Sequence, residues 1–464
     1  MSANQKFRYG GRVFAQAVRV LLPVAVVLAT AGAIAAPAAA APNTADPFYT
    51  PPADYEAAQP GTILRTRSIE PSFSQLIPMR VDAWQLLYRT TDAGGRPYAA
   101  VTTVLKPVDM ARPTALLSYQ NMTDAVAPHC QPSQTLQQGK VPWFDLSSSS
   151  PIQLSTMANE TPMVAAALAR GWAVSVPDHG GVDNNSGGYR EPGYVVLDGI
   201  RAATAFDSLS LDPDTRTVLW GYSGGGMASS WAAREQPSYA PELNLVGAAL
   251  GAPVADTRAA LLATNGTPVG GAFVLLGLIG MVQDSPEFAA ALNRYLTPAG
   301  RQKITEAMAN CAPQNMASFL GFDANQFLTA PLEHVLADPI IGAALTARNL
   351  DAPAPTAPLY VYNAIDDEGS TIAAVDAFVE NHCATGTSVT YRRSQLSMPL
   401  SGHTGEWFLG APAALAWLQQ QVEDPSPQTG CDTRTIPTTA VEPEALEALT
   451  SGILTGSIRA LLGF

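Results

Sequence analysis

The chain has 464 residues, of which 47% are apolar and 14% are charged. The charged share is below the roughly one quarter of an average globular protein, and the apolar share suffices for a core, which excludes whole-chain disorder. An excess of 39 acidic over 26 basic residues gives a net charge of −13, which argues against nucleic-acid binding through a basic face.

The first 45 residues differ from the rest of the chain. Their only charges are basic and precede an apolar run over residues 21–36, after which Ala38 and Ala40 are the small residues of a cleavage site. The run is shorter than the roughly 20 residues that span a bilayer. The pattern predicts a signal peptide over residues 1–40, cut after Ala40, and therefore a secreted protein.

The four cysteines are Cys130, Cys311, Cys383 and Cys431. An even number of widely spaced cysteines in an exported protein favours two disulfides. No C-x-x-C spacing is present, which argues against a zinc or redox pair. The spacing alone leaves all three pairings open.

Short strands and helices alternate through the rest of the chain. The pattern predicts strands at 83–90, 98–105, 115–119, 172–176, 217–220, 245–250, 359–363 and 388–392, and helices at 162–170, 194–206, 227–234, 372–380 and 412–421. Such alternation is typical of a mostly parallel sheet covered by helices on both faces. Residues 423–437, rich in Pro, Ser and Thr, are interpreted as a surface loop.

One stretch breaks this alternation. Residues 254–351 are Ala-rich and helical in pattern, with no clear strand, and they lie between two sheet strands. We expect a helical cap here, inserted between a first core part at 41–253 and a second part with the C-terminal tail at 352–464. The tail from residue 443 onward predicts a short amphipathic helix.

Ser223 is the strongest candidate for chemistry, because it is the centre of Gly221-Tyr222-Ser223-Gly224-Gly225, the only G-x-S-x-G in the chain. A predicted strand precedes this motif and a predicted helix follows it. A serine on such a turn is raised above the sheet, and the flanking glycines let backbone elements approach closely. The pattern therefore predicts a nucleophile in an α/β-hydrolase fold.

A serine nucleophile needs a base, and five histidines are available. In this architecture the chain order is Ser, then acid, then His, which favours His403, in an expected loop between the last strand and the last helix. His382 is the second choice. The remaining histidines are His129, His179 and His334.

The acid should follow a strand between Ser223 and His403. The strand at 359–363 ends just before Asp366, Asp367 and Glu368. A buried carboxylate there would orient the imidazole, but the pattern alone does not choose among the three acids. One or two of them could instead cap a helix that begins near residue 370.

These fragments together resemble the secretory lipase family. The matching pieces are residues 118–120 with Asp124 and Cys130, 178–180, 197–201, 221–225, 367–368 and His403. The resemblance runs from about residue 55 to residue 431 and implies an α/β-hydrolase fold.

The resemblance also implies roles for individual residues. The family's Asp-Glu pair falls on Asp367 and Glu368, which makes Asp367 the acid. Its oxyanion hole falls on the backbone N–H groups of Asp124 and Gly224. Asp366 stands where the family commonly has a proline, and this departure keeps Asp366 in question as an alternative acid.

Two disulfides are implied by the same resemblance. One joins a cysteine after the oxyanion loop to one in the cap, here Cys130–Cys311, and the other joins Cys383 to Cys431.

The sequence as a whole is interpreted as a secreted serine lipase or esterase that hydrolyses carboxylic esters, triacylglycerols foremost, without a cofactor or a metal. Its expected partners are a lipid or other ester and a lipid–water interface, with no nucleic acid, and the oligomeric state is left open. An acyltransferase or polyester hydrolase is the alternative with the same chemistry. A catalytically inactive hydrolase fold that binds a ligand is the alternative from another class.

The cap contains one run, residues 272–282, that lacks charges and side-chain hydrogen-bonding groups. A helix buried on all sides is the plain interpretation. Gly277 and Gly280 weaken a simple helix, since each interior glycine costs ~1 kcal/mol. We expect this run to line an acyl site above Ser223, so that Trp at Leu276 or Leu278 would suppress long-chain esters.

Overall fold

The computed structural model describes residues 46–108, 110–139, 154–185, 189–350, 353–396, 398, 401–425 and 430–462. The predicted signal peptide at 1–40 lies outside these ranges. The described chain is built around a ten-stranded sheet in the order β1-β4-β5-β7-β6-β8-β9-β10-β11-β12. Its strands are β1 Ile63–Ser68, β4 Val81–Thr91, β5 Pro97–Pro107, β6 Leu116–Gln120, β7 Ala173–Pro177, β8 Thr217–Tyr222, β9 Leu245–Gly251, β10 Leu359–Ala364, β11 Val389–Ser394 and β12 Cys431–Ile436; β2 Ser72–Phe73 and β3 Ile77–Pro78 form a separate ribbon.

The sheet is antiparallel at one end and parallel over the remainder. β1, β4, β5 and β7 pair antiparallel, whereas all pairs from β7 through β6 to β12 are parallel. The β4–β5 connection is short, and a short turn can join only antiparallel neighbours. Parallel neighbours need a crossover, which the helices between the later strands provide. The predicted fold class, a mostly parallel sheet with helices, is confirmed.

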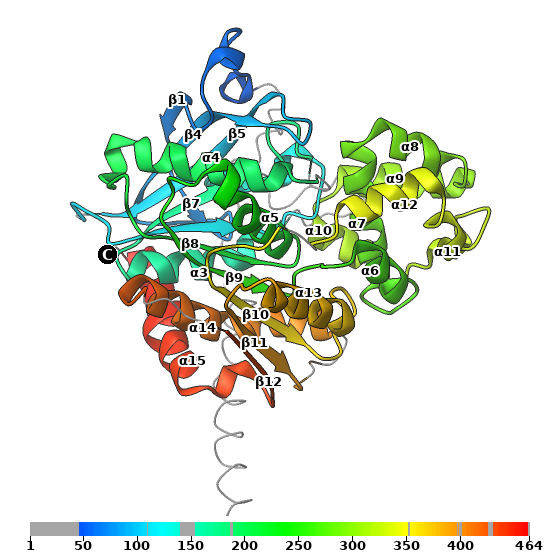
Figure 1. Cartoon of the computed structure of the whole chain (residues 1–464). Coiled ribbons are helices and arrows are strands. Elements are labelled where there is room, and N and C mark those ends of the chain that lie inside the picture. Colours follow the sequence, from blue (N-terminus) through cyan, green and yellow to red (C-terminus); the bar gives the residue numbers. More distant parts are fainter. Residues whose placement is uncertain are drawn as a thin grey trace, which may run out of the picture. The chain divides into compact units, whose positions relative to one another are not determined.

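Helices cover both faces of the sheet, as Figure 1 shows. Successive strand residues alternate between the faces, so that Leu117 and Val218 join one apolar cluster while Leu116 and Leu219 join the other. The first cluster includes residues of α3 Met157–Ala169, α14 Gly402–Glu423 and α16 Thr455–Leu462. The second includes residues of α4 Glu191–Ala205, α5 Gly224–Tyr239 and α13 Ile372–Ala384.

Between β9 and β10 the described chain is helical and forms its own apolar cluster, centred on Leu275, Phe288 and Val335. These helices lie together at one side of the sheet in Figure 1. They are α6 Thr257–Thr264, α7 Gly271–Asp284, α8 Pro286–Asn293, α9 Pro298–Ala309, α10 Ala312–Ser318, α11 Leu332–Val335 and α12 Pro339–Ala347. The two remaining short helices are α2 Pro132–Thr135 and α15 Pro443–Glu447.

Two sequence expectations about the C-terminal part are wrong. The expected loop at 423–437 contains β12, an edge strand that pairs with β11 alone and exposes Arg434. A strand with one paired edge and mostly exposed side chains has no apolar alternation to reveal it. The last long helix begins at Gly402 rather than at Pro412, because Ser401 caps it and Pro412 is accommodated inside it.

Candidate functional site

Ser223 lies on the turn that joins β8 to α5. Its backbone angles are φ 53° and ψ −120°, a strained conformation for a residue with a side chain. The neighbouring glycines are required by close backbone contacts: a Cβ on Gly221 would stand 2.1 Å from the carbonyl oxygen of Gly225, and one on Gly225 would stand 2.0 Å from that of Gln120. The turn therefore holds the serine hydroxyl at the carboxyl edge of the sheet.

His403 contacts Ser223 directly. Its Nε2 lies 2.8 Å from Ser223 Oγ, and its ring is buried. Contrary to expectation it lies in the first turn of α14 instead of a loop, and its carbonyl accepts a hydrogen bond of 2.6 Å from Tyr222 Oη. This turn of helix fixes the imidazole over the serine.

Asp367 is the carboxylate that reaches His403, whose Nδ1 is 2.8 and 3.0 Å from its two oxygens. Asp367 is 5% exposed, whereas Asp366 is exposed to solvent. The N–H groups of Gly369 and Ser370 also donate to Asp367 Oδ1, at 2.8 and 2.6 Å. The bonds hold the carboxylate so that an imidazole protonated on Nδ1 can present Nε2 as an acceptor to the serine.

Glu368 supports the N-terminal end of α14, next to the hydrogen-bonded residues Ser223, His403 and Asp367. It accepts a hydrogen bond from Ser401 Oγ, and His403 N donates to its second oxygen at 3.3 Å. Burial lowers the pKa of His403, but the negative charges of Asp367, Glu368 and Asp124 outweigh it, so the net pKa is raised. The surroundings thus favour a histidine that can accept a proton.

Asp124 and Gly224 meet beside Ser223. Gly224 is the first residue of α5, and the first N–H groups of a helix have no partner within it. Asp124, in the loop after β6, has a left-handed φ of 40°, and a Cβ on Gly224 would stand 2.2 Å from its Oδ1. Burial raises the pKa of Asp124 to about 6, although His403 opposes this.

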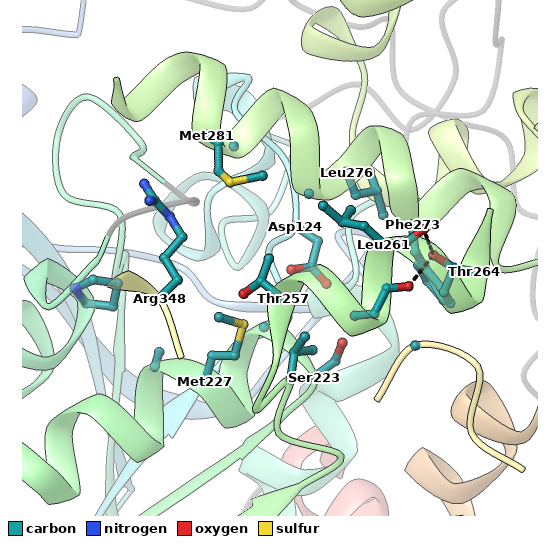
Figure 2. A pocket seen from close by; sticks show the side chains of 18 of the residues that line it. Asp124, Ser223, Met227, Thr257, Leu261, Thr264, Phe273, Leu276, Met281 and Arg348 are labelled. Atoms are coloured by element: carbon teal, nitrogen blue, oxygen red, sulfur yellow. Dashed lines mark hydrogen bonds between the residues drawn. The ribbon is translucent and has the colours of Figure 1, made fainter. Parts of the chain in front are cut away.

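A pocket opens over Ser223 (Figure 2). Its floor consists of Ser223, Gly224, Asp124, Gly369 and His403. Its roof consists of residues from α6 and α7: Thr257, Ala260, Leu261, Thr264, Phe273, Leu276, Gly277, Gly280 and Met281. In Figure 2, Leu276 and Met281 lie on the opposite side of the pocket from Ser223 and Met227. The roof is mostly apolar, with Thr257 and Thr264 as its polar side chains, and Arg348 and the α5 residues Met227, Ala228 and Trp231 also line the pocket.

The apolar run at 272–282 thus divides between two surroundings. Leu275, Leu276, Leu278, Ile279 and Met281 all belong to the apolar cluster of the helical segment, but among these five only Leu276 and Met281 also line the pocket. The expectation that Leu278 lines the pocket is wrong, because it falls on the face of α7 that packs against its neighbouring helices.

The other histidines lie outside the series from Ser223 to Asp367. His382, the second candidate base, is buried in α13 against Phe378, with ring centroids 4.4 Å apart. Burial lowers its pKa to about 4. His179 lines the pocket, and its Nε2 lies 2.8 Å from the carbonyl oxygen of Asn121, a contact that sequence reasoning missed.

Two disulfides are present, with the pairing that the resemblance implies. Cys130–Cys311 ties the chain after β6 to the start of α10, and Cys383–Cys431 ties α13 to β12. The first bond lies among Ala125 and Ala127, so it anchors the loop that carries Asp124. Both bonds suit an oxidising compartment.

Comparison with known proteins points in one direction. The model of the family described as secretory lipase matches residues 146–430. Lipase A of Arthroderma benhamiae is 36% identical over 419 residues, which cover 89% of this chain and 87% of that protein. A Mycobacterium tuberculosis protein named "Probable inactive lipase MT1628" is 40% identical over 376 residues, which cover 80% of this chain and 81% of that protein.

Among solved structures, Candida antarctica lipase A in its closed state aligns with a TM-score of 0.75. The alignment covers 90% of this chain and 96% of that one, at 25% sequence identity. Its agreement with the ten-stranded sheet and its helices confirms the α/β-hydrolase fold expected from the sequence.

Proposed function

The chain belongs to the secretory lipase family and is a carboxylic ester hydrolase; on that premise we propose that it hydrolyses acylglycerols through an acyl-enzyme formed on Ser223. The family and the disulfides are consistent with an extracellular protein. We further propose that the signal peptide at 1–40 is removed after Ala40.

The proposed reaction begins with attack of Ser223 Oγ on the ester carbonyl carbon. His403 Nε2 takes the hydroxyl proton and then gives it to the leaving alcohol as the carbon–oxygen bond breaks. Asp367 stabilises the imidazolium that exists between these two transfers. A water molecule, deprotonated by the same histidine, then attacks the acyl-enzyme and releases the carboxylic acid with Ser223 restored.

Negative charge develops on the carbonyl oxygen during both halves of the reaction. In the proposal, the backbone N–H groups of Asp124 and Gly224 donate to that oxygen. A fixed donor of this kind contributes roughly 3 kcal/mol to the transition state in enzymes where one has been removed. The position of Gly224 at the start of α5 adds the positive end of the helix dipole.

One observation carries the proposal above the rest: Ser223, His403 and Asp367 form a continuous hydrogen-bonded series in a buried site. Such a series is what a serine hydroxyl requires to act as a nucleophile. The apolar roof supports an ester with a hydrocarbon chain, because each CH₂ that leaves water contributes about 0.8 kcal/mol. We propose that the roof binds the acyl chain and that the helices of residues 254–351 control its entry.

A ligand-binding protein without activity is the second candidate, and it is favoured by the Mycobacterium tuberculosis relative, which is named as a probable inactive lipase. Hydrolysis of p-nitrophenyl butyrate by the wild type beside Ser223→Ala separates the two. We expect the wild type to turn over and the variant to lose on the order of 10⁴-fold or more in kcat. Equal rates for both would overturn the proposed function.

An acyltransferase or a polyester hydrolase would share the same acyl-enzyme. An acyltransferase differs from a lipase in the nucleophile that takes the acyl group from the enzyme. A polyester hydrolase differs in the polymer that supplies the acyl group. Product analysis with tributyrin, with and without an added alcohol acceptor, distinguishes the lipase from the transferase: free acid as the main product supports the lipase, and transfer to the alcohol at the expense of acid supports the transferase.

A further inference from the structure

The loop at residues 121–127, which carries Asp124, is held by buried polar side chains that the proposed reaction does not use. The left-handed φ of 40° at Asp124 costs free energy in a non-glycine residue and persists only where the surroundings enforce it. Glu160, in the first turn of α3, is one of these surroundings, and its side chain is 0% exposed.

Glu160 receives hydrogen bonds from this loop and from the strand before it. Tyr119 Oη donates to Glu160 Oε1 at 2.9 Å. The N–H of Met122 lies 3.3 and 3.2 Å from the two carboxyl oxygens, and Asn121 Nδ2 donates to Oε2. All these partners are donors, and at a pH above the raised pKa of Glu160 its carboxylate accepts from every one of them.

Further hydrogen bonds hold the loop at residues 121–127 in place. Thr156, the residue directly before α3, donates from Oγ1 to the carbonyl oxygen of Met122 at 2.6 Å. From the chain after β7, His179 Nε2 lies 2.8 Å from the carbonyl oxygen of Asn121. Asn184 Nδ2, in the same region, donates to the carbonyl oxygen of Ala125 at 3.0 Å. The loop is therefore fastened at both ends of the segment that contains Asp124.

Burial of Glu160 at this position is unfavourable for the stability of the protein. Burial raises its pKa to about 8, although the hydrogen bonds from Tyr119 and Met122 oppose the shift. A buried ionisable group reduces stability unless its surroundings compensate fully. Groups of this kind are concentrated at functional sites, where position matters more than stability.

We propose that Glu160 is a positioning residue that fixes the backbone of residues 121–124, so that the N–H of Asp124 faces the oxyanion. The proposal rests on the proposed function, in which that N–H stabilises the tetrahedral intermediate. Donors that are already oriented cost no reorganisation during the reaction. A displacement of about 1 Å in such a group can reduce the rate about 10²-fold.

Glu160→Gln tests the role at roughly pH 9, where wild-type Glu160 is ionised, because the amide keeps the size of the side chain but turns an NH₂ group toward a donor. We expect kcat for p-nitrophenyl butyrate to fall by about 10²-fold with KM within about twofold. The affinity for an alkyl trifluoromethyl ketone should fall by a similar factor, because its serine adduct places an oxyanion in the same position. Tm is measured beside these values to separate loss of function from unfolding.

Asp198→Asn is the matched control, since Asp198 is a buried carboxylate of α4 that accepts from Thr90, Tyr239 and Arg201. We expect it to lower Tm while leaving kcat and ketone affinity near wild type. If both variants lowered kcat equally, or if Glu160→Gln kept kcat within twofold, the positioning role would be overturned.

A second variant covers the case in which Glu160→Gln does not fold. Thr156→Val removes the bond to Met122 with little change in volume, and we expect a kcat loss of about tenfold. Unchanged kcat in this variant would overturn the proposal. Ser223→Ala in the same assay keeps the two claims apart: loss of activity there, with none in the loop variants, leaves the proposed function standing and removes only the role of Glu160.

Discussion

The part of the pocket floor around Ser223 is polar and fixed by hydrogen bonds, whereas the roof is mostly apolar and held by side-chain packing. On the floor, Ser223, His403 and Asp367 are joined at distances of 2.8 to 3.0 Å. On the roof, Leu276 and Met281 line the pocket and pack within the apolar cluster of the helical segment. Directional bonds fix atoms to within fractions of an ångström, and apolar contacts adapt to shape. The difference agrees with our proposal that the floor carries the chemistry and the roof selects the acyl chain.

The glycines on the two sides differ in the same way. A Cβ on Gly225 of the floor motif would collide with backbone at 2.0 Å, which no side-chain movement relieves. A Cβ on Gly277 of the roof would meet only the side-chain atom Leu261 Cδ2 at 3.0 Å. The roof can therefore accommodate changes in shape that the floor cannot.

The largest expected effect is on the floor. Asp367→Asn removes the carboxylate that orients His403, and we expect kcat to fall on the order of 10⁴-fold. Asp366→Asn is the matched control, because Asp366 is adjacent, identical in chemistry and exposed, and it should stay within about twofold of wild type. A large loss at Asp366 with a nearly normal Asp367→Asn, measured with p-nitrophenyl butyrate, would exchange the two roles.

The next prediction concerns the two disulfides, one of which connects the floor of the pocket to its roof. Cys130–Cys311 joins the loop of Asp124 to the helical segment across 181 residues, and Cys383–Cys431 spans 48. From loop entropy, paired Cys→Ala changes should lower the free energy of unfolding by about 5 and about 4 kcal/mol respectively. Urea unfolding measures both.

Of the two disulfides, only Cys130–Cys311 anchors the loop that carries Asp124. Only its removal should therefore also lower kcat in the folded protein. Equal kcat in the two double variants would mean that this disulfide acts on stability alone.

Leu276→Trp tests the roof. The indole would fill space that we assign to the acyl chain, and displacing about four CH₂ groups costs about 3 kcal/mol, or on the order of 10²-fold in kcat/KM. The loss should appear with p-nitrophenyl palmitate and stay within about threefold with the acetate. Leu278→Trp is the control in the same helix, and it should reduce stability by overpacking without changing chain-length preference. A change of preference at Leu278 but not at Leu276 would place the acyl chain elsewhere.

The smallest effect concerns pH. In the proposed reaction His403 acts as a base only when neutral, so we expect activity to rise as pH increases through its pKa, which is raised by the carboxylates that oppose burial. Glu368→Gln removes one of these charges, and the acid limb of kcat/KM should move to lower pH. Glu287→Gln, at an exposed site on α8, is the control and should leave the limb in place. A shift to higher pH in Glu368→Gln would contradict this electrostatic account.

Candidate site residues could be predicted from the sequence where a local motif or the order of residues along the chain indicates them. Ser223 stands in a motif whose glycines report the backbone contacts that they permit, and His403 follows from chain order. Asp366 and Asp367 could not be separated by local pattern, because burial distinguishes them and burial depends on how the loop after β10 folds. The family resemblance chose Asp367 before the geometry was known.

Other features left no local signal. Glu160 and His179 contact the backbone of a loop that is distant from them in sequence. Because every residue has the same backbone groups, the sequence of the loop does not reveal these contacts. β12 lies at the sheet edge with few buried side chains, so its pattern resembles a loop. Leu276 and Leu278 are identical in type and both join the apolar core of the helical segment, and only the packing of α7 brings Leu276 to the pocket wall as well.

The division between floor and roof is tested most directly by the ratio of kcat/KM for p-nitrophenyl palmitate to that for the acetate, in Glu160→Gln and Leu276→Trp. The account predicts that Glu160→Gln lowers both values by the same factor and leaves the ratio unchanged. It predicts that Leu276→Trp lowers the ratio by on the order of 10²-fold, almost wholly through the palmitate. A changed ratio in Glu160→Gln, or equal losses on both esters in Leu276→Trp, would contradict it.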